Sequence, residues 1–103
     1  MKHEIGVMLP VTGKTDFAAR FREAQAMGIT SCQISVWNTQ LYTDETATAI
    51  RAAVSETGFC ISLLWAGWSG PCEWNFTAGP DTIGLVPEAY RGIRLKELEA
   101  ASA

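Results

Sequence analysis

Two junctions that lie thirty residues apart constrain the fold of this chain more than any other feature of its sequence. Gly28-Ile29 and Gly58-Phe59 each follow an amphipathic segment with helical spacing and precede a short apolar segment. Glycine readily takes the left-handed conformation that ends a helix, and about thirty residues is an ordinary length for one strand-and-helix unit. Successive units of this kind imply parallel strands. We therefore predict an α/β fold made of repeated βα units.

Hydrophobic periodicity gives the approximate bounds of the elements. Strands are expected over residues 5–9, 31–37 and 60–65, and helices over 16–27, 44–57 and 87–103. Thr15 and Thr43 are the predicted N-caps of the first two helices, and Pro87 is the predicted first residue of the last. The 21 residues of 66–86 contain two Gly-Pro pairs. This stretch is too long for an ordinary connection, so we expect either a binding loop or a disordered one.

Length and composition place these elements in one domain, residues 1–103. The chain is 48% hydrophobic and 18% charged, which is ordinary for a globular protein with a modest core. A parallel sheet of three strands leaves two edges unpaired, whereas such sheets are normally covered on both faces or closed into barrels. We therefore expect the first three βα units of an incomplete (β/α) barrel, completed by a longer chain or by self-association through the open sheet edges.

Charge and cysteine content argue against several classes of function. The net charge is −3 and the eight Lys and Arg residues form no basic stripe, which argues against nucleic acid as a partner. No apolar run approaches the roughly 20 residues that span a membrane and no signal peptide is evident, so a cytoplasmic protein is predicted. The three cysteines form no CxxC pair, which argues against a disulfide framework or a zinc site. Cys32 and Cys60 are expected to be small buried strand residues.

A short motif resembles part of a nucleotide-binding loop. Gly13-Lys14-Thr15 lies between a predicted strand and a predicted helix, as such a loop would. The loop also needs a glycine five positions earlier, where this chain has Met8, and Pro10 removes one backbone amide. We interpret the motif as a tight polar turn.

Tryptophans gather at the predicted carboxyl ends of the strands. Trp37 ends the second strand, Trp65 and Trp68 follow the third, and Trp74 lies further along the chain. Ligands of parallel α/β folds bind at these ends, and an indole offers a flat apolar face with one N–H donor, which suits a sugar. The alternative is that each tryptophan only caps the core. The predicted substrate-binding residues are Trp37, Asn38, Trp65, Gly67 and Trp68.

Groups for acid–base chemistry are few. His3 precedes the first strand and so lies at the opposite end of the predicted sheet. Glu73 and Asp81 lie in the long connection, where isolated carboxylates are usually solvated. We therefore predict no catalytic residue and no metal ligand.

Several short motifs together resemble one protein family. They are Ile5-Gly6-Val7, Leu64-Trp65-Ala66-Gly67-Trp68, Ile83-Gly84-Leu85-Val86-Pro87, Tyr90-Arg91 and Arg94-Leu95. With these motifs the chain resembles the sugar phosphate isomerase/epimerase family, whose fold is the xylose-isomerase-like TIM barrel. The resemblance covers essentially the whole chain and about the first three eighths of such a barrel.

The resemblance implies a metal-dependent enzyme that acts on a sugar or sugar phosphate. A complete family member is expected to bind a divalent metal (Mn, Mg, Co or Zn) and to interconvert ketoses with aldoses, or epimers, by proton transfer next to a carbonyl. Its metal ligands and proton-transfer residues come from later strands. This chain would then bind no metal, form part of the substrate wall and be inactive alone. The alternatives are a non-catalytic carbohydrate-binding module and a structural βα module.

Overall fold

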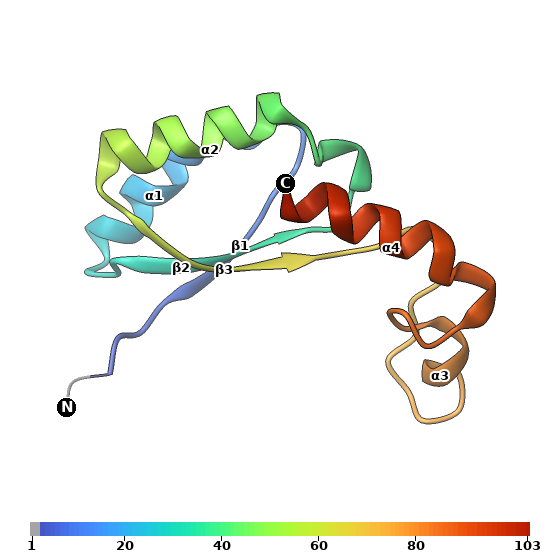
Figure 1. The fold of residues 1–103 in the computed structure, drawn as a ribbon. Helices are drawn as coiled ribbons and strands as arrows, with labels where there is room; N and C mark the ends of the chain where they lie inside the picture. The colour runs from blue at the N-terminus through green and yellow to red at the C-terminus, as the bar shows by residue number, and fades with distance from the viewer. Residues whose placement is uncertain (1–2) are drawn as a thin grey trace.

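The computed structural model describes residues 3–103 and contains one three-stranded parallel sheet with helices (Figure 1). The strand order is β1-β2-β3, and β2 pairs parallel with both of its neighbours. The predicted α/β class and parallel strands are therefore confirmed. The elements in chain order are β1 (Val7–Pro10), α1 (Phe17–Ala26), β2 (Ser31–Val36), the 3-10 helix η1 (Thr39–Leu41), α2 (Asp44–Thr57), β3 (Cys60–Ala66), α3 (Gly79–Thr82) and α4 (Glu88–Ser102).

The hydrophobic core lies between the sheet and the helices α1 and α2, which both cover the same face (Figure 1). Phe21 of α1 is fully buried and stacks on Phe59, with ring centroids 4.9 Å apart. Burying a side chain of this size stabilises a fold by about 1.5–3 kcal/mol. The alternation predicted for the second strand is confirmed, because Cys32, Ile34 and Val36 are buried while Gln33 is exposed and Ser35 is half-buried. The core residues are Val11, Phe21, Ala24, Cys32, Ile34, Val36, Ala53 and Phe59.

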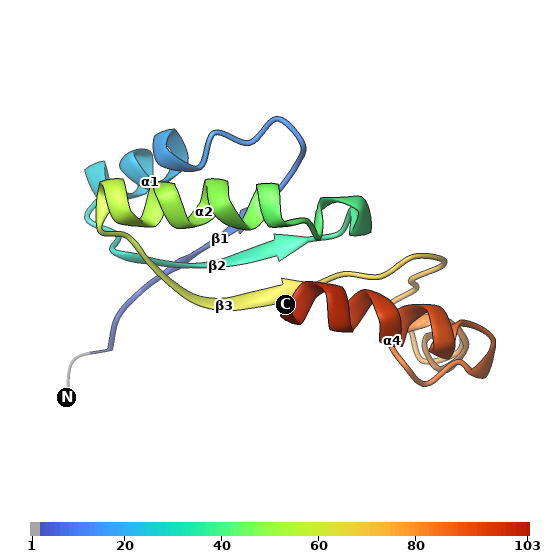
Figure 2. The same ribbon diagram turned by 45° about the horizontal axis from the view of Figure 1, so that its top comes forward.

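The opposite face of the sheet is not covered by any helix of the described residues (Figure 2). Met8, Leu63 and Trp65 lie in the strands and are 47%, 46% and 42% exposed. β3 carries an irregularity near its start, where Cys32 pairs with Ile61 but the next residue of β2 pairs with Leu63. This irregularity sets which side chains of β3 share a face with those of β2.

Helix capping follows the sequence prediction for α2 but not for α1. Thr43 caps α2 by accepting a hydrogen bond from the Thr46 backbone N–H, and Gly58 ends the helix with φ of +70°. The predicted cap at Thr15 is wrong, because the Asp16 carboxylate accepts the hydrogen bond from the Ala19 N–H. Thr15 is occupied in the preceding turn, where its hydroxyl accepts from the Thr12 N–H at 2.8 Å.

Three further details differ from the sequence prediction. Pro87 is the N-cap of α4 and not its first residue. Cys32 is buried as predicted, but Cys60 is exposed because the start of β3 forms an edge of the sheet. The stretch 66–86 is partly regular, since Ala66 belongs to β3 and α3 forms at Gly79–Thr82. Within residues 3–103, no helix is long and apolar enough to cross a bilayer.

Candidate functional site

Four tryptophans form a continuous cluster at the carboxyl end of the sheet, which we call the indole wall (Trp37, Trp65, Trp68 and Trp74). Trp37 meets Trp68 edge-on, with ring centroids 5.1 Å apart and planes at 65°. Trp74 links Trp68 to Trp65, because its ring centroid lies 6.2 Å from that of Trp68 and 6.4 Å from that of Trp65. The fold therefore brings together side chains that are far apart in the chain, as the parallel topology predicted.

A shallow pocket of about 380 Å³ lies beside this wall on the bare face of the sheet. Its lining is mostly apolar, with three indoles and a thioether; its one polar side chain is the hydroxyl of Ser35, and it contains no charged side chain. Trp68 does not line this pocket and stands behind Trp37 and Trp74. The lining residues are Met8, Ser35, Trp37, Trp65 and Trp74.

Gly67 sets the close approach between the ends of β2 and β3. It is buried, and its N–H donates a 2.7 Å hydrogen bond to the Val36 carbonyl. A Cβ atom added to Gly67 would lie 2.7 Å from the Cα atom of Trp37 and 2.6 Å from its ring. Any larger residue would clash with Trp37, so only glycine allows Trp37 to pack this closely at the ends of β2 and β3.

Tyr42 braces the same junction, which sequence reasoning missed. Its hydroxyl lies 3.0 Å from the Val36 carbonyl oxygen and 2.9 Å from that of Gly67. Burial raises the pKa of Tyr42 above its usual value, and the negative charge of Glu97 raises it further. The hydroxyl therefore stays protonated and can donate to the carbonyls at the carboxyl ends of β2 and β3.

Asn38 lies next to the wall but uses its side-chain oxygen locally. Its Oδ1 accepts a 3.0 Å hydrogen bond from the Gln40 N–H and so caps η1. The Thr39 hydroxyl lies 3.3 Å from the Ser69 hydroxyl, which links η1 to the chain that follows Trp68. Asn38 therefore helps to shape the rim of the site.

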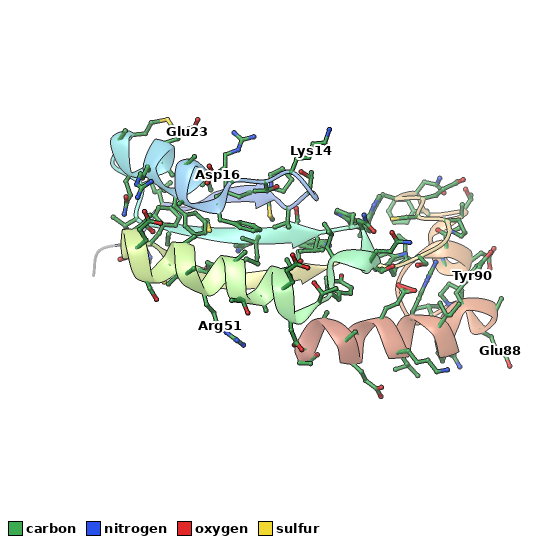
Figure 3. The ribbon with its side chains drawn as sticks, turned by 90° about the horizontal axis from the view of Figure 1, so that it is seen from above. Lys14, Asp16, Glu23, Arg51, Glu88 and Tyr90 are labelled. Carbon is green, nitrogen blue, oxygen red and sulfur yellow. The ribbon has the colours of Figure 1, made fainter. Side chains whose placement is uncertain are left out.

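The connecting segment (residues 67–86) is held by one buried arginine that sequence reasoning also missed. Arg94 of α4 is only 2% exposed and donates hydrogen bonds to four backbone carbonyls of this segment. Its guanidinium also lies over the rings of Trp68 and Tyr90, at 5.4 and 4.7 Å from their centroids. Figure 3 shows Tyr90 on α4, beside the connecting segment. The sequence signal was an arginine among apolar positions of an amphipathic helix.

The carboxylates and the histidine that the sequence offered for acid–base chemistry do not converge at the indole wall. Glu73 is exposed, and its carboxylate lies 3.5 Å from the amide of Asn75. Asp81 is exposed in α3, and His3 precedes β1 at the other end of the sheet. Within residues 3–103, no group of three or more His, Cys, Asp or Glu side chains is placed to hold a metal ion. The described residues therefore do not fit the divalent metal that the family resemblance implies.

The Gly13-Lys14-Thr15 motif forms part of the turn before α1. The Thr12 and Thr15 hydroxyls lie 3.1 Å apart, and the side chain of Lys14 is exposed and points outward (Figure 3). The turn is thus closed by its own side chains, in agreement with the interpretation as a polar turn.

Comparisons with models of known protein families, with curated proteins and with solved structures gave no match to this chain.

Proposed function

We propose that this chain is the N-terminal part of a (β/α)-barrel sugar isomerase or epimerase and that its indole wall binds the substrate. One observation carries the proposal: a parallel sheet is covered on one face by α1 and α2 and gathers four tryptophans at the carboxyl end of its strands. In a (β/α) barrel the bare face is turned inward, and substrates bind at the carboxyl ends of the strands. The indole wall stands where the substrate of such a barrel binds.

The chemistry of the pocket favours the uncharged part of a sugar. Trp37, Trp65 and Trp74 present apolar faces that suit the C–H face of a sugar ring, while Ser35 supplies a hydroxyl. A phosphate group requires cationic or backbone N–H donors, and no Lys or Arg lines this pocket. In a sugar phosphate, we therefore assign the carbon chain and its hydroxyls to the wall. The groups that move the proton and hold the metal are assigned to later βα units.

Sugar binding is tested by titrating the tryptophan fluorescence of the chain with xylose, fructose and other monosaccharides in metal-free buffer. We expect saturable quenching, because three of the four indoles line the pocket. Trp74→Ala should weaken the affinity about two- to tenfold, since one aromatic contact contributes about 0.5–1.5 kcal/mol. Phe76→Ala is the matched control, because Phe76 is a fully exposed aromatic residue of the same segment that does not line the pocket.

Two outcomes would contradict this assignment. Quenching that stays linear up to high sugar concentration, or an equal loss of affinity in both variants, would remove the indole wall as the binding surface. Turnover of a ketose by this chain alone with Mn²⁺ or Co²⁺ would show that it contains the catalytic groups, against the proposed division of roles.

A second candidate is a carbohydrate-binding module that does not react with its ligand. The uncharged lining of the pocket favours it, because such a surface needs only to stack and to form hydrogen bonds. Methyl glycosides distinguish the two candidates. An isomerase site is built for a sugar with a free carbonyl or anomeric hydroxyl, so it should prefer the free sugar. A binding module should bind the methyl glycoside equally well.

A further inference from the structure

We propose that Arg94 is a positioning residue, which holds the connecting segment so that Trp68 and Trp74 complete the indole wall. The inference rests on the proposed sugar-binding function for its biological meaning, but its structural part can be tested without any sugar. Trp65 lies in β3 and Trp37 directly follows β2, whereas Trp68 and Trp74 belong to the connecting segment after β3. Their places are therefore set by the connecting segment and by whatever fixes it.

The hydrogen bonds of Arg94 join the two ends of that segment. Its Nε donates to the Ser69 carbonyl at 3.1 Å and its Nη2 to the Pro71 carbonyl at 3.0 Å, which holds the beginning of the segment. Its Nη1 donates to the carbonyls of Thr82 at 2.6 Å and Gly84 at 2.8 Å, which holds the end. One planar group thus closes the segment that carries Trp74 into a loop.

The guanidinium also contacts the wall directly. It lies between the rings of Trp68 and Tyr90, and Trp68 in turn contacts both Trp37 and Trp74. A cation over an aromatic face attracts the ring electrostatically, and this attraction grows when water is excluded. Arg94 therefore helps to fix the ring of Trp68, although neither residue lines the pocket itself.

The environment of Arg94 is specific for an arginine. Within residues 3–103, no carboxylate lies within ion-pair distance of it, so the buried charge is stabilised by carbonyl dipoles and aromatic faces. A lysine keeps the charge but offers three donors from one nitrogen atom, whereas the guanidinium offers five in a planar fork. Lysine cannot reach carbonyls at both ends of the segment at once. Arg94→Lys therefore separates the role of the geometry from the role of the charge.

Arg91 provides a matched control on the same helix. It also donates to two carbonyls, those of Leu85 and Val86, at 2.8 and 2.9 Å. Its side chain is exposed, and these contacts lie beyond the loop that Arg94 closes. Arg91→Met removes an arginine and two hydrogen bonds without touching the wall.

The experiment compares the wild-type chain, Arg94→Lys and Arg91→Met. The ¹⁹F NMR spectrum of protein labelled with fluorotryptophan, with resonances assigned by Trp→Phe variants, reports on the wall itself. We expect Arg94→Lys to shift or broaden the Trp68 and Trp74 resonances and to weaken sugar affinity about tenfold, the loss expected when the support of a binding site is removed. Arg91→Met should leave the spectrum and the affinity unchanged, and the far-UV circular dichroism of all three should agree.

Gly70→Ala provides a second route if Arg94→Lys does not fold. Gly70 has φ of +92°, and an added Cβ would lie 3.3 Å from Nη2 of Arg94 and 3.5 Å from the Tyr90 ring. The substitution disturbs the loop at this contact while the charge stays in place. It should shift the same two tryptophan resonances.

The outcomes separate this inference from the proposed function. Unchanged Trp68 and Trp74 resonances in Arg94→Lys, or in Gly70→Ala where that variant is needed, would overturn the positioning role. Wild-type affinity in the same variant would overturn it as well. If the wild-type chain binds no sugar while the resonances still move, the sugar-binding proposal fails and the positioning role of Arg94 stands.

Discussion

Adding one methyl group at Gly67 tests the contact on which the geometry of the indole wall depends. The new Cβ atom would lie 2.7 Å from the Cα atom of Trp37, which is backbone and cannot move by a side-chain rotation. The backbone segments that directly follow β2 and β3 would have to move apart. The 2.7 Å hydrogen bond from the Gly67 N–H to the Val36 carbonyl, and the one between Tyr42 and Gly67, would then lengthen or break.

The expected cost of Gly67→Ala follows from these contacts. Overpacking a well-filled site costs about 1–3 kcal/mol, and each lost hydrogen bond about 0.5–1.5 kcal/mol. We expect the free energy of unfolding to fall by about 2–4 kcal/mol. This is a large part of the roughly 5–15 kcal/mol that stabilises a typical domain, so the midpoint of urea unfolding should shift clearly.

Gly92→Ala is the control for this measurement. Gly92 lies inside α4, and nothing lies within 4 Å of a Cβ added there. It should stabilise the chain by up to about 1 kcal/mol, because alanine is the better helix former. In the double variant Trp37→Ala/Gly67→Ala the ring contact is gone but the contact with the Trp37 Cα atom remains, so only part of the loss should be recovered. A Gly67→Ala variant as stable as wild type, or one fully rescued by Trp37→Ala, would refute the argument.

Four further predictions concern single side chains. A thiol reagent should modify the other two cysteines of the native chain but reach Cys32 only after unfolding; equal rates for all three would contradict its burial. Burial raises the pKa of Cys32, and the neighbouring Cys60 raises it to a smaller extent. The contribution of Cys32 to stability should therefore be complete below the pKa of an unfolded thiol, about 8.5, and should decline as the pH rises towards the higher pKa of the folded state. A urea midpoint that does not fall between pH 8 and 10 would contradict this. Tyr42→Phe should lower the free energy of unfolding by about 0.5–1.5 kcal/mol because the bridging donor is lost, and an unchanged thermal midpoint would show that the bridge contributes nothing. Asp16→Ala should cost about 1 kcal/mol, and no change would return the cap of α1 to Thr15.

The features that the sequence predicted well are those with local causes. Gly58 ends α2 in the left-handed conformation and Thr43 caps its start, because both depend only on residues within one turn of the helix. The alternating burial of β2 follows from a periodicity of two residues. The misplaced cap of α1 shows the limit of such rules, since Thr15 and Asp16 are both good caps and the choice depended on a hydrogen bond to Thr12.

The candidate site was predictable only in outline. The sequence placed Trp37, Trp65 and Trp68 at strand ends, and parallel topology then required those ends to meet. It did not reveal that Gly67 is buried against Trp37. It also did not show that Asn38 uses its oxygen to cap η1, because that depends on the path of the following turn.

The sequence by itself determined the strand-and-helix units, their parallel direction and the end of the sheet where the tryptophans collect, because periodicity, capping and connection length act over short distances along the chain. Only the tertiary structure decided what holds that end together. Arg94 contacts carbonyls that lie 10 to 25 residues before it, and Tyr42 joins the exits of two different strands. No local pattern encodes these partners, because backbone carbonyls are the same at every position and only the folded chain brings particular ones within reach.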